Sequence, residues 1–162
     1  MRTQTNFARE MRAGEEEQID QLLRMSFASP TEAQQVRKLR KSRVYAGETV
    51  LPLGDEIIGY YALSYLIKPK GWLCLAPVAV HPEHQRQGRG KRMIGMLTEW
   101  ARLTQSPIVV LGDPAFYEKA GFDGAMAAHL HTPYEIKKTM LAGVSTPAKQ
   151  QELVYPPAFS GV

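Results

Sequence analysis

The chain has 162 residues, of which 44% are hydrophobic and 22% charged, with 20 lysines and arginines against 16 aspartates and glutamates. This length predicts one domain, and the mild basic excess at residues 37–43 and 86–92 favours local anion-binding sites over a nucleic-acid-binding surface. A single cysteine excludes a disulfide framework, and no apolar run approaches the ~18 residues that a membrane span needs. The acids at residues 15–17 exclude a signal peptide. We therefore expect a cytoplasmic protein.

The first 41 residues predict one strand followed by two helices. Residues 6–12 form a weak apolar strand, and residues 14–27 carry apolar side chains at helical spacing behind an acidic start. After Pro30, the sequence Thr31-Glu-Ala-Gln34 has the form of a capping box, which predicts that a second helix begins there and reaches about residue 41.

Three β segments follow. The runs 49–53 and 57–67 are rich in β-forming residues and are separated by Gly54-Asp55, which predicts a tight hairpin turn. The run 73–80, LCLAPVAV, is continuously apolar, and we expect it to form a further strand.

The turn after residue 80 is the most informative part of the chain. It reads Gln85-x-x-Gly88-x-Gly90, and glycines at these positions let the backbone pass close to a ligand. A helix that begins here leaves backbone N–H groups unpaired, and its dipole favours negative charge. Four cationic side chains crowd the same turn: Arg86, Arg89, Lys91 and Arg92. The pattern predicts a pyrophosphate-binding turn.

Two other phosphate-binding motifs do not fit these residues. A nucleotide P-loop needs a glycine where Gln85 stands and a hydroxyl where Arg92 stands. A dinucleotide-binding fingerprint needs a third glycine at the position of Met93.

The turn belongs to a predicted βαβ unit. Residues 91–104 place apolar side chains on one helical face, Ser106-Pro107 ends that helix, and the apolar run 108–111 is typical of a covered parallel strand. A short helix should follow, with Asp113 as its N-cap and Gly121 just beyond its end. We also expect a hairpin at residues 134–141.

The turn motif and the later sequence Phe116-Tyr-Glu-Lys-x-Gly121-Phe together resemble the GNAT superfamily of acyl-CoA-dependent N-acetyltransferases. Segments 73–80 and 110–117 are similar to a bacterial subgroup of predicted N-acetyltransferases. The resemblance spans residues 7–141. Ala76 stands where the subgroup has glycine. Asp113 and Pro114 stand where many relatives place an asparagine that holds the pantetheine arm, so that role is not carried over.

The resemblance implies an α/β GNAT fold, with a central mixed, twisted sheet of about seven strands flanked by about four helices. The domain would span residues 1–142. Residues 143–162 form an irregular, proline-containing tail that packs either on the domain or on a partner subunit, and a homodimer is left open.

The resemblance also implies a direct transfer of an acetyl group from acetyl-CoA, the co-substrate, to an amine acceptor, without a metal. The implied acetyl-CoA-binding residues are Val78, Ala79 and Val80 along the pantetheine, and Arg86, Gln87, Gly88, Arg89, Gly90 and Lys91 around the pyrophosphate. Tyr117 matches the family tyrosine that assists the leaving thiolate. With ordinary pKa values of about 10 and 8.5, proton transfer from the phenol would be uphill by about 2 kcal/mol.

No general base is assigned, because Asp55, Glu56 and Glu83 are near in sequence but none has a compelling position. Several alternatives stay open. Tyr117 could be a core aromatic, and a non-catalytic acyl-CoA-binding sensor could dispense with it. A nucleic-acid-binding protein is less consistent with the sequence, because segment 81–99 has no aromatic residue among its basic ones. Cys74 is expected to be buried filler, and the four histidines lack the spacing of a zinc site.

Overall fold

The computed structural model describes residues 7–160, so Asn6, where the predicted first strand begins, and the last two residues of the tail lie outside the described part. The elements, in chain order, are β1 (Arg9–Glu10), α1 (Glu16–Phe27), α2 (Thr31–Arg40), β2 (Tyr45–Leu53), β3 (Glu56–Tyr65), β4 (Leu73–Val80), α3 (Arg89–Thr104), β5 (Ile108–Leu111), α4 (Pro114–Lys119), β6 (Leu130–His131), β7 (Thr139–Ala142) and β8 (Gln151–Glu152). In the described residues, no helix is both long and apolar enough to span a membrane.

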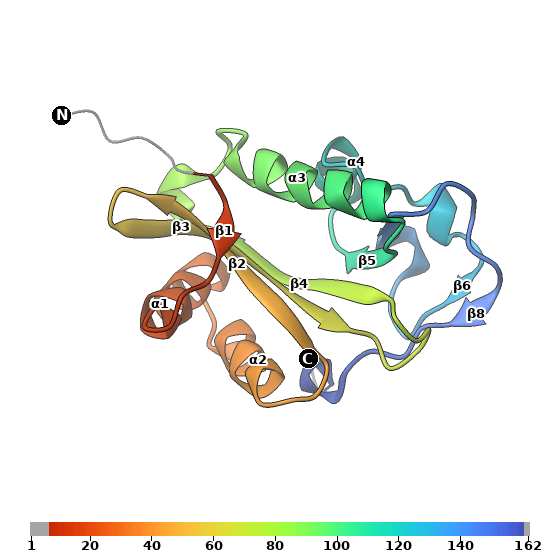
Figure 1. Cartoon of the computed structure of the whole chain (residues 1–162), viewed down its shortest axis with the longest axis horizontal. Coiled ribbons are helices and arrows are strands. Elements are labelled where there is room, and N and C mark those ends of the chain that lie inside the picture. Colours follow the sequence, from red (N-terminus) through yellow and green to blue (C-terminus); the bar gives the residue numbers. More distant parts are fainter. Residues whose placement is uncertain (1–6, 161–162) are drawn as a thin grey trace.

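The main sheet has six strands in the order β1-β2-β3-β4-β5-β7, and a separate pair joins β6 and β8. Only β4 and β5 are parallel neighbours in the main sheet; its other neighbours are antiparallel. Helices α1 and α2 cover one face of this sheet and α3 covers the other (Figure 1). The expected mixed α/β architecture is confirmed, with six strands in the main sheet where about seven were expected.

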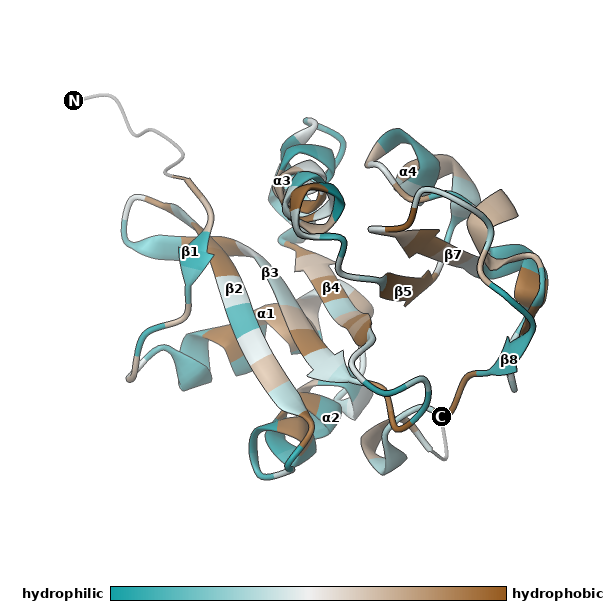
Figure 2. Ribbon diagram, turned by 45° about the vertical axis from the view of Figure 1, so that its right-hand side comes forward, coloured by the Kyte–Doolittle hydropathy of each residue, from teal (hydrophilic) through white to brown (hydrophobic). Residues whose placement is uncertain are grey.

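Two hydrophobic clusters hold the helices on the sheet. On the α3 side, Ile94, Leu97 and Ala101 are buried against strand residues such as Leu75 and Val110. On the other side, α1 and α2 bury their own apolar faces against β2 and β3. Figure 2 shows the resulting pattern, because α3 is brown towards the sheet, and the strands β5 and β7 are among the most hydrophobic segments. The helical and strand periodicities of the sequence therefore determine which faces meet.

The predicted hairpin at residues 134–141 is wrong. Residues 136–138 form a 3-10 turn, and only β7 is extended, antiparallel to β5. The Thr139 hydroxyl donates to the Glu135 carbonyl over 2.8 Å, which favours a turn where the first arm of the hairpin was expected. The other edge of β7 is bridged by Asp123, whose backbone exchanges two hydrogen bonds with Leu141.

The predicted capping box at the start of α2 is also wrong. Pro30 occupies the N-cap position and no side chain caps the helix there. Instead, the Ser29 hydroxyl accepts a hydrogen bond from the Thr31 backbone N–H over 3.2 Å. A serine two residues before an unpaired amide provides the same kind of partner as a capping side chain.

The C-terminal tail lies against the domain in this structure. Leu153 and Phe159 are buried in one cluster with Leu39 of α2 and Cys74 of β4. The Val154 carbonyl also accepts a hydrogen bond from the Ile67 N–H over 2.8 Å. The tail therefore contributes to the hydrophobic core on the α2 side.

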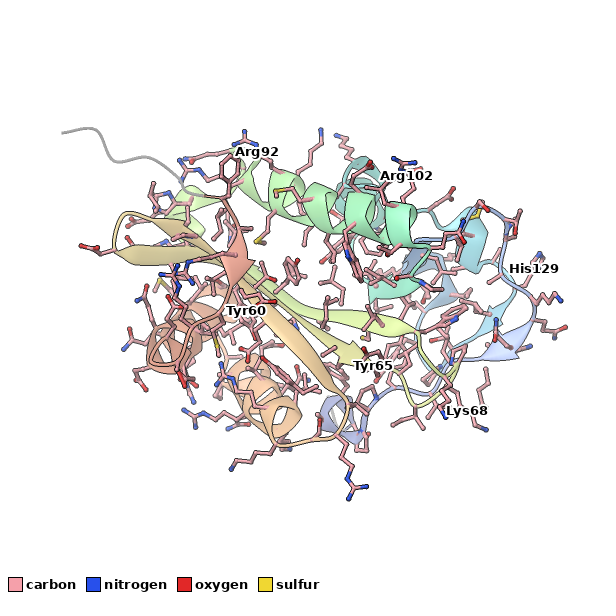
Figure 3. All side chains as sticks on the ribbon, viewed as in Figure 1. Tyr60, Tyr65, Lys68, Arg92, Arg102 and His129 are labelled. Carbon is pink, nitrogen blue, oxygen red and sulfur yellow. The ribbon has the colours of Figure 1, made fainter. Side chains whose placement is uncertain are left out.

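One charged cluster is buried between α2 and the sheet. The Glu48 carboxylate of β2 has a fully buried side chain and accepts two hydrogen bonds from Arg40, both over 2.8 Å. It accepts two more from the phenols of Tyr45, over 3.0 Å, and Tyr60, over 2.7 Å. Four donors thus satisfy one buried carboxylate, which is the arrangement that makes a buried charge tolerable. In Figure 3, Tyr60 lies in the interior of the molecule.

Cys74 should be inert to thiol reagents while the protein is folded. It is 3% exposed on β4, and burial raises the pKa of its thiol to about 12. Because only the thiolate reacts, labelling by a disulfide reagent at pH 8 should be at least about 10²-fold slower than in the denatured chain. Stopped-flow labelling with and without denaturant measures this ratio. Equal rates in the two states would contradict the buried position.

Candidate functional site

The candidate site begins where β4 and β5 separate. Their parallel ladder pairs Leu73, Cys74 and Leu75 of β4 with residues 108–110, and β5 then ends at Leu111. Strand β4 continues to Val80, paired only with β3. Within residues 7–160, no strand lies along the other edge of residues 76–80, so an extended ligand has an open main-chain edge beside it.

The end of β4 is held in place by two side chains from other elements. The Val80 carbonyl accepts hydrogen bonds from the Ser26 hydroxyl of α1, over 3.1 Å, and from the Gln85 side-chain amide, over 2.9 Å. The next residue, His81, donates its backbone N–H to the Ile58 carbonyl of β3. These contacts fix the strand end from which the turn departs.

The turn between β4 and α3 has two residues in left-handed conformation. Gly88 has a φ of 77° and is the N-cap of α3, and Arg86 has a φ of 64°. Glycine adopts this conformation without a steric cost, whereas arginine does so only under constraint from its surroundings. Helix α3 begins at Arg89, two residues before the predicted start. The predicted role of Gly88 in shaping the turn is therefore consistent with its backbone angles.

The first three backbone amides of α3, at residues 89–91, have no acceptor within the helix, and Gly88 has no side chain to cap them. The first N–H of this region that is paired belongs to Arg92, which donates to the Gly88 carbonyl over 3.0 Å. Residues 85–88 and Lys91 are exposed, so the turn that leads into the helix is open to solvent. Unpaired amides at the start of a 16-residue helix are a ready anion-binding site.

The basic side chains of the turn differ in their surroundings. Arg86 and Lys91 are exposed, as is the side chain of Gln87. Arg89 is half-buried, and one of its guanidinium nitrogens lies 2.8 Å from Nδ1 of His84. The turn can thus present the exposed charges of Arg86 and Lys91 beside its amides, while the charge of Arg89 is held by His84.

Gly90 marks the point where three elements meet. A side-chain carbon at this position would lie 3.1 Å from Val80 of β4 and 3.4 Å from the ring of Phe116 on α4. The glycine therefore lets the first turn of α3 approach both neighbours. Through it, the predicted pantetheine strand, the predicted pyrophosphate turn and the helix that carries Tyr117 are brought together.

Tyr117 is positioned by the short helix α4. As predicted, Asp113 caps this helix, and its carboxylate accepts the Ala115 N–H over 3.1 Å. The Tyr117 ring packs edge-to-face against Phe116 and Phe122, with ring centres 4.9 and 5.7 Å away. It also covers Gly112, where any side chain would collide with it.

The environment of Tyr117 keeps its phenol protonated. Burial, followed by the nearby Asp113 carboxylate, raises the pKa of Tyr117 to about 12. Both effects disfavour the phenolate, so at neutral pH the hydroxyl is a hydrogen-bond donor. Full proton transfer to a thiolate of pKa about 8.5 is then uphill by about 5 kcal/mol, more than the sequence alone suggested. At neutral pH this hydroxyl can therefore offer a hydrogen bond, but not a proton, to a thiolate.

The three candidate acids, Asp55, Glu56 and Glu83, lie around His81. Glu56 contacts Nε2 of His81 at 3.4 Å, and with Asp55 it lines a cavity of about 670 Å³ between α1 and the β2–β3 turn. Glu83 donates its backbone N–H to Nδ1 of His81. In residues 7–160, no group of three or more metal-ligating side chains is placed to hold an ion.

The sequence did not predict two side-chain contacts with the Val80 carbonyl. Ser26 contacts Val80 across 54 residues of chain, and no local pattern signals such a contact. Gln85 was part of the turn motif, but its bond to the Val80 carbonyl became visible only in three dimensions.

Comparison with known proteins identifies the family of this chain. A family model for the acetyltransferase (GNAT) domain matches residues 40–123, more than half of the chain. An uncharacterised N-acetyltransferase, YhbS of Escherichia coli (strain K12), is 34% identical over 117 residues, or 68% of each chain.

Two crystal structures share the fold. The YhbS structure from Escherichia coli, in complex with CoA, has a TM-score of 0.85 at 24% identity and covers 98% of this chain and 93% of that one. A GNAT family acetyltransferase from Brucella melitensis, in complex with acetyl-CoA, has a TM-score of 0.80 at 22% identity over 97% and 99% of the two chains. By sequence and by fold, this chain belongs to the GNAT acetyltransferase family.

Proposed function

We propose that this protein transfers the acetyl group of acetyl-CoA to an amine acceptor. The observation that carries the proposal is the start of α3, where the amides of residues 89–91 have no intrahelical partner, next to the open edge of β4. A diphosphate needs several donors and positive charge, and an extended amide chain needs a free strand edge. Both features lie together here, which fits the pyrophosphate and the adjoining pantetheine arm of one CoA molecule.

The proposal assigns one binding role to the turn before α3 and another to the end of β4. The amides at residues 86–91, with the side chains of Arg86, Arg89 and Lys91, hold the pyrophosphate. The backbone of residues 78–80 aligns the pantetheine arm. Charge-assisted hydrogen bonds of this kind contribute about 1.5–3 kcal/mol each, so a few of them account for binding in the micromolar range.

Tyr117 is the proposed catalytic residue. Acetyl-CoA, when bound, supplies an acetyl thioester. The neutral acceptor nitrogen forms the new bond to the acetyl carbon and the carbon–sulfur bond breaks, while the Tyr117 phenol donates a hydrogen bond to the departing sulfur. The nitrogen gives up one proton to water, and the CoA thiolate takes one up from water, so the products are the acetylated amine and CoA thiol. The raised pKa of Tyr117 supports this role, because the donor stays protonated throughout the neutral range.

The alternative is a sensor that binds acyl-CoA without turnover. The packing of Tyr117 between two rings also suits a purely structural aromatic. The two functions are separated by following free thiol release from acetyl-CoA across panels of small amines, amino acids, aminoglycosides and peptide amines. Calorimetric binding of CoA without release by any acceptor class would favour the sensor. An absence of binding would contradict both.

Gly88→Ala should weaken CoA binding. Alanine at a φ of 77° costs about 1–2 kcal/mol, and relief of that strain would turn the adjacent amides away from a common anion. We expect the dissociation constant for CoA, measured by calorimetry, to rise about tenfold. Gly95→Ala is the matched control, because Gly95 lies within the same helix, away from the turn, with open space around it. Equal affinities of wild type and Gly88→Ala would count against the proposed role of the turn.

A further inference from the structure

The outer face of α3 carries an apolar stripe that nothing in the described chain covers. Met96, Trp100 and Leu103 are 49%, 44% and 68% exposed, and they follow one another at helical spacing. They border a groove of about 820 Å³ that runs along the helix. A soluble domain seldom exposes several large apolar side chains side by side unless they meet a partner.

Gly95 lies beside this apolar stripe and lines the same groove. A side-chain carbon at Gly95 would meet no atom within 4 Å, so the helix surface is lowest there and opens directly to the groove. Helices approach each other most closely at small residues, since backbone then meets backbone. Glycine within a helix lowers helix stability by about 0.5–1 kcal/mol relative to alanine. Gly95 therefore leaves the helix less stable but its surface open.

The charges on the same face are arranged for self-pairing. Arg92 and Glu99 both lie opposite the buried side of α3, about two turns apart. In Figure 3, Arg92 and Arg102 project from α3 away from the sheet. If two copies of the helix cross antiparallel about a two-fold axis between residues 95 and 96, Arg92 of each copy faces Glu99 of the other. The same axis places Gly95 opposite Gly95 and Met96 opposite Met96.

Neither Arg92 nor Glu99 has a strong ion pair within the described chain that would prevent this pairing. Among residues 7–160, no carboxylate lies within 4 Å of the Arg92 guanidinium. Glu99 pairs with Arg102 one turn along, but both side chains are more than half exposed. Exposed pairs of this kind contribute little, so Glu99 can exchange partners without a large cost.

We propose that a second copy of this chain docks on α3 through this face. A two-fold contact requires one surface to be complementary to itself, and the combination of Arg92, Glu99 and the Gly95 notch meets that requirement. The contact can extend beyond the helix, because Phe7, 84% exposed, borders a smaller cavity together with Arg92 and Met96. Gly88 and Lys91 of the proposed pyrophosphate-binding turn line the same groove, so dimer formation is measured in the absence of CoA, but the pairing itself does not require acetyl transfer.

Charge reversal tests the pairing. Sedimentation velocity from about 1 to 100 μM should show the wild type shifting to a dimer, and Glu99→Arg or Arg92→Glu should each raise the dimer dissociation constant more than about tenfold. The double variant Arg92→Glu/Glu99→Arg should recover the wild-type constant, because both cross-pairs are restored with their signs exchanged. A wild type that stays monomeric, or a double variant no better than the singles, overturns the proposal.

Gly95→Leu tests whether dimer formation can be lost without lowering the stability of the single copy. The side chain has open space in the single copy, so the melting temperature measured by circular dichroism at low concentration should be unchanged or higher, while dimer formation is lost. Gly95→Cys should also cross-link to a covalent dimer on oxidation, since the native Cys74 is buried. The matched control is Gly124→Cys, which also has open space around it but lies outside α3. Dimerisation by Gly95→Leu, or cross-linking that is equal in the two cysteine variants, overturns the assignment of this face.

Discussion

Tyr117→Phe is expected to lower kcat about 10²-fold while changing the affinity for CoA less than about twofold. The substitution removes only the hydroxyl. The ring, which packs against Phe116 and Phe122 and covers Gly112, stays in place. The donor is then missing only where negative charge develops on the sulfur. Steady-state kinetics with the best acceptor, together with calorimetry on CoA, measures the two quantities separately.

The pH dependence of this loss gives a second check. The pKa of Tyr117 is raised above its ordinary value to about 12, so the phenol keeps its proton until the pH approaches that value and loses it only above. The ratio of wild-type to variant kcat should therefore be constant between about pH 7 and 10. Phe116→Leu is the control for altered ring packing. If Tyr117→Phe turns over at the wild-type rate, the hydroxyl has no part in the reaction.

Glu48→Ala is expected to lower the free energy of unfolding by about 3–5 kcal/mol. The substitution removes the acceptor for four hydrogen bonds and leaves the Arg40 guanidinium and the Tyr60 hydroxyl without a partner beneath α2. The Arg40 side chain is 21% exposed, so it keeps most of its desolvation cost when its partner is lost. Urea unfolding followed by circular dichroism measures the loss.

Tyr45→Phe is the matched control for this cluster. It removes one neutral donor to Glu48, over 3.0 Å, and leaves the ion pair intact, so the loss should be only about 1 kcal/mol. Similar losses in Glu48→Ala and Tyr45→Phe would mean that the Arg40–Glu48 pair contributes little. Because the cluster lies on the α2 side of the sheet, the folded fraction of either variant should still bind CoA in a calorimetric titration.

The elements whose signals come from residues close together in the sequence were predictable. The unit from β4 through α3 to β5 follows from one apolar run, one helical periodicity and a second apolar run, and each is a local signal. The short helix α4 follows from Asp113 before Pro114. The left-handed position at Gly88 likewise follows from residue type, since glycine is the residue that adopts it freely.

The predictions failed where a long-range contact outweighed a local pattern. Segment 134–141 has residues that suit a hairpin, yet its second half pairs with β5 and its first half turns. At the start of α2, the capping-box pattern is present, but Ser29 already serves the amide of Thr31. Alternating or capping residues show what a segment can form, while the available partner decides what it does form.

Residue types and their spacing by themselves determined the glycine turn, its positive charge and the aromatic helix that follows, because these features are built from residues close together in the chain. Only the tertiary structure decided that β5 leaves β4 after Leu75, that Ser26 holds the end of β4 and that Glu48 meets Arg40. It also decided which face of α3 stays uncovered. Strand register and buried pairings join residues distant in the chain, and their free energy depends on packing and desolvation that no local pattern encodes.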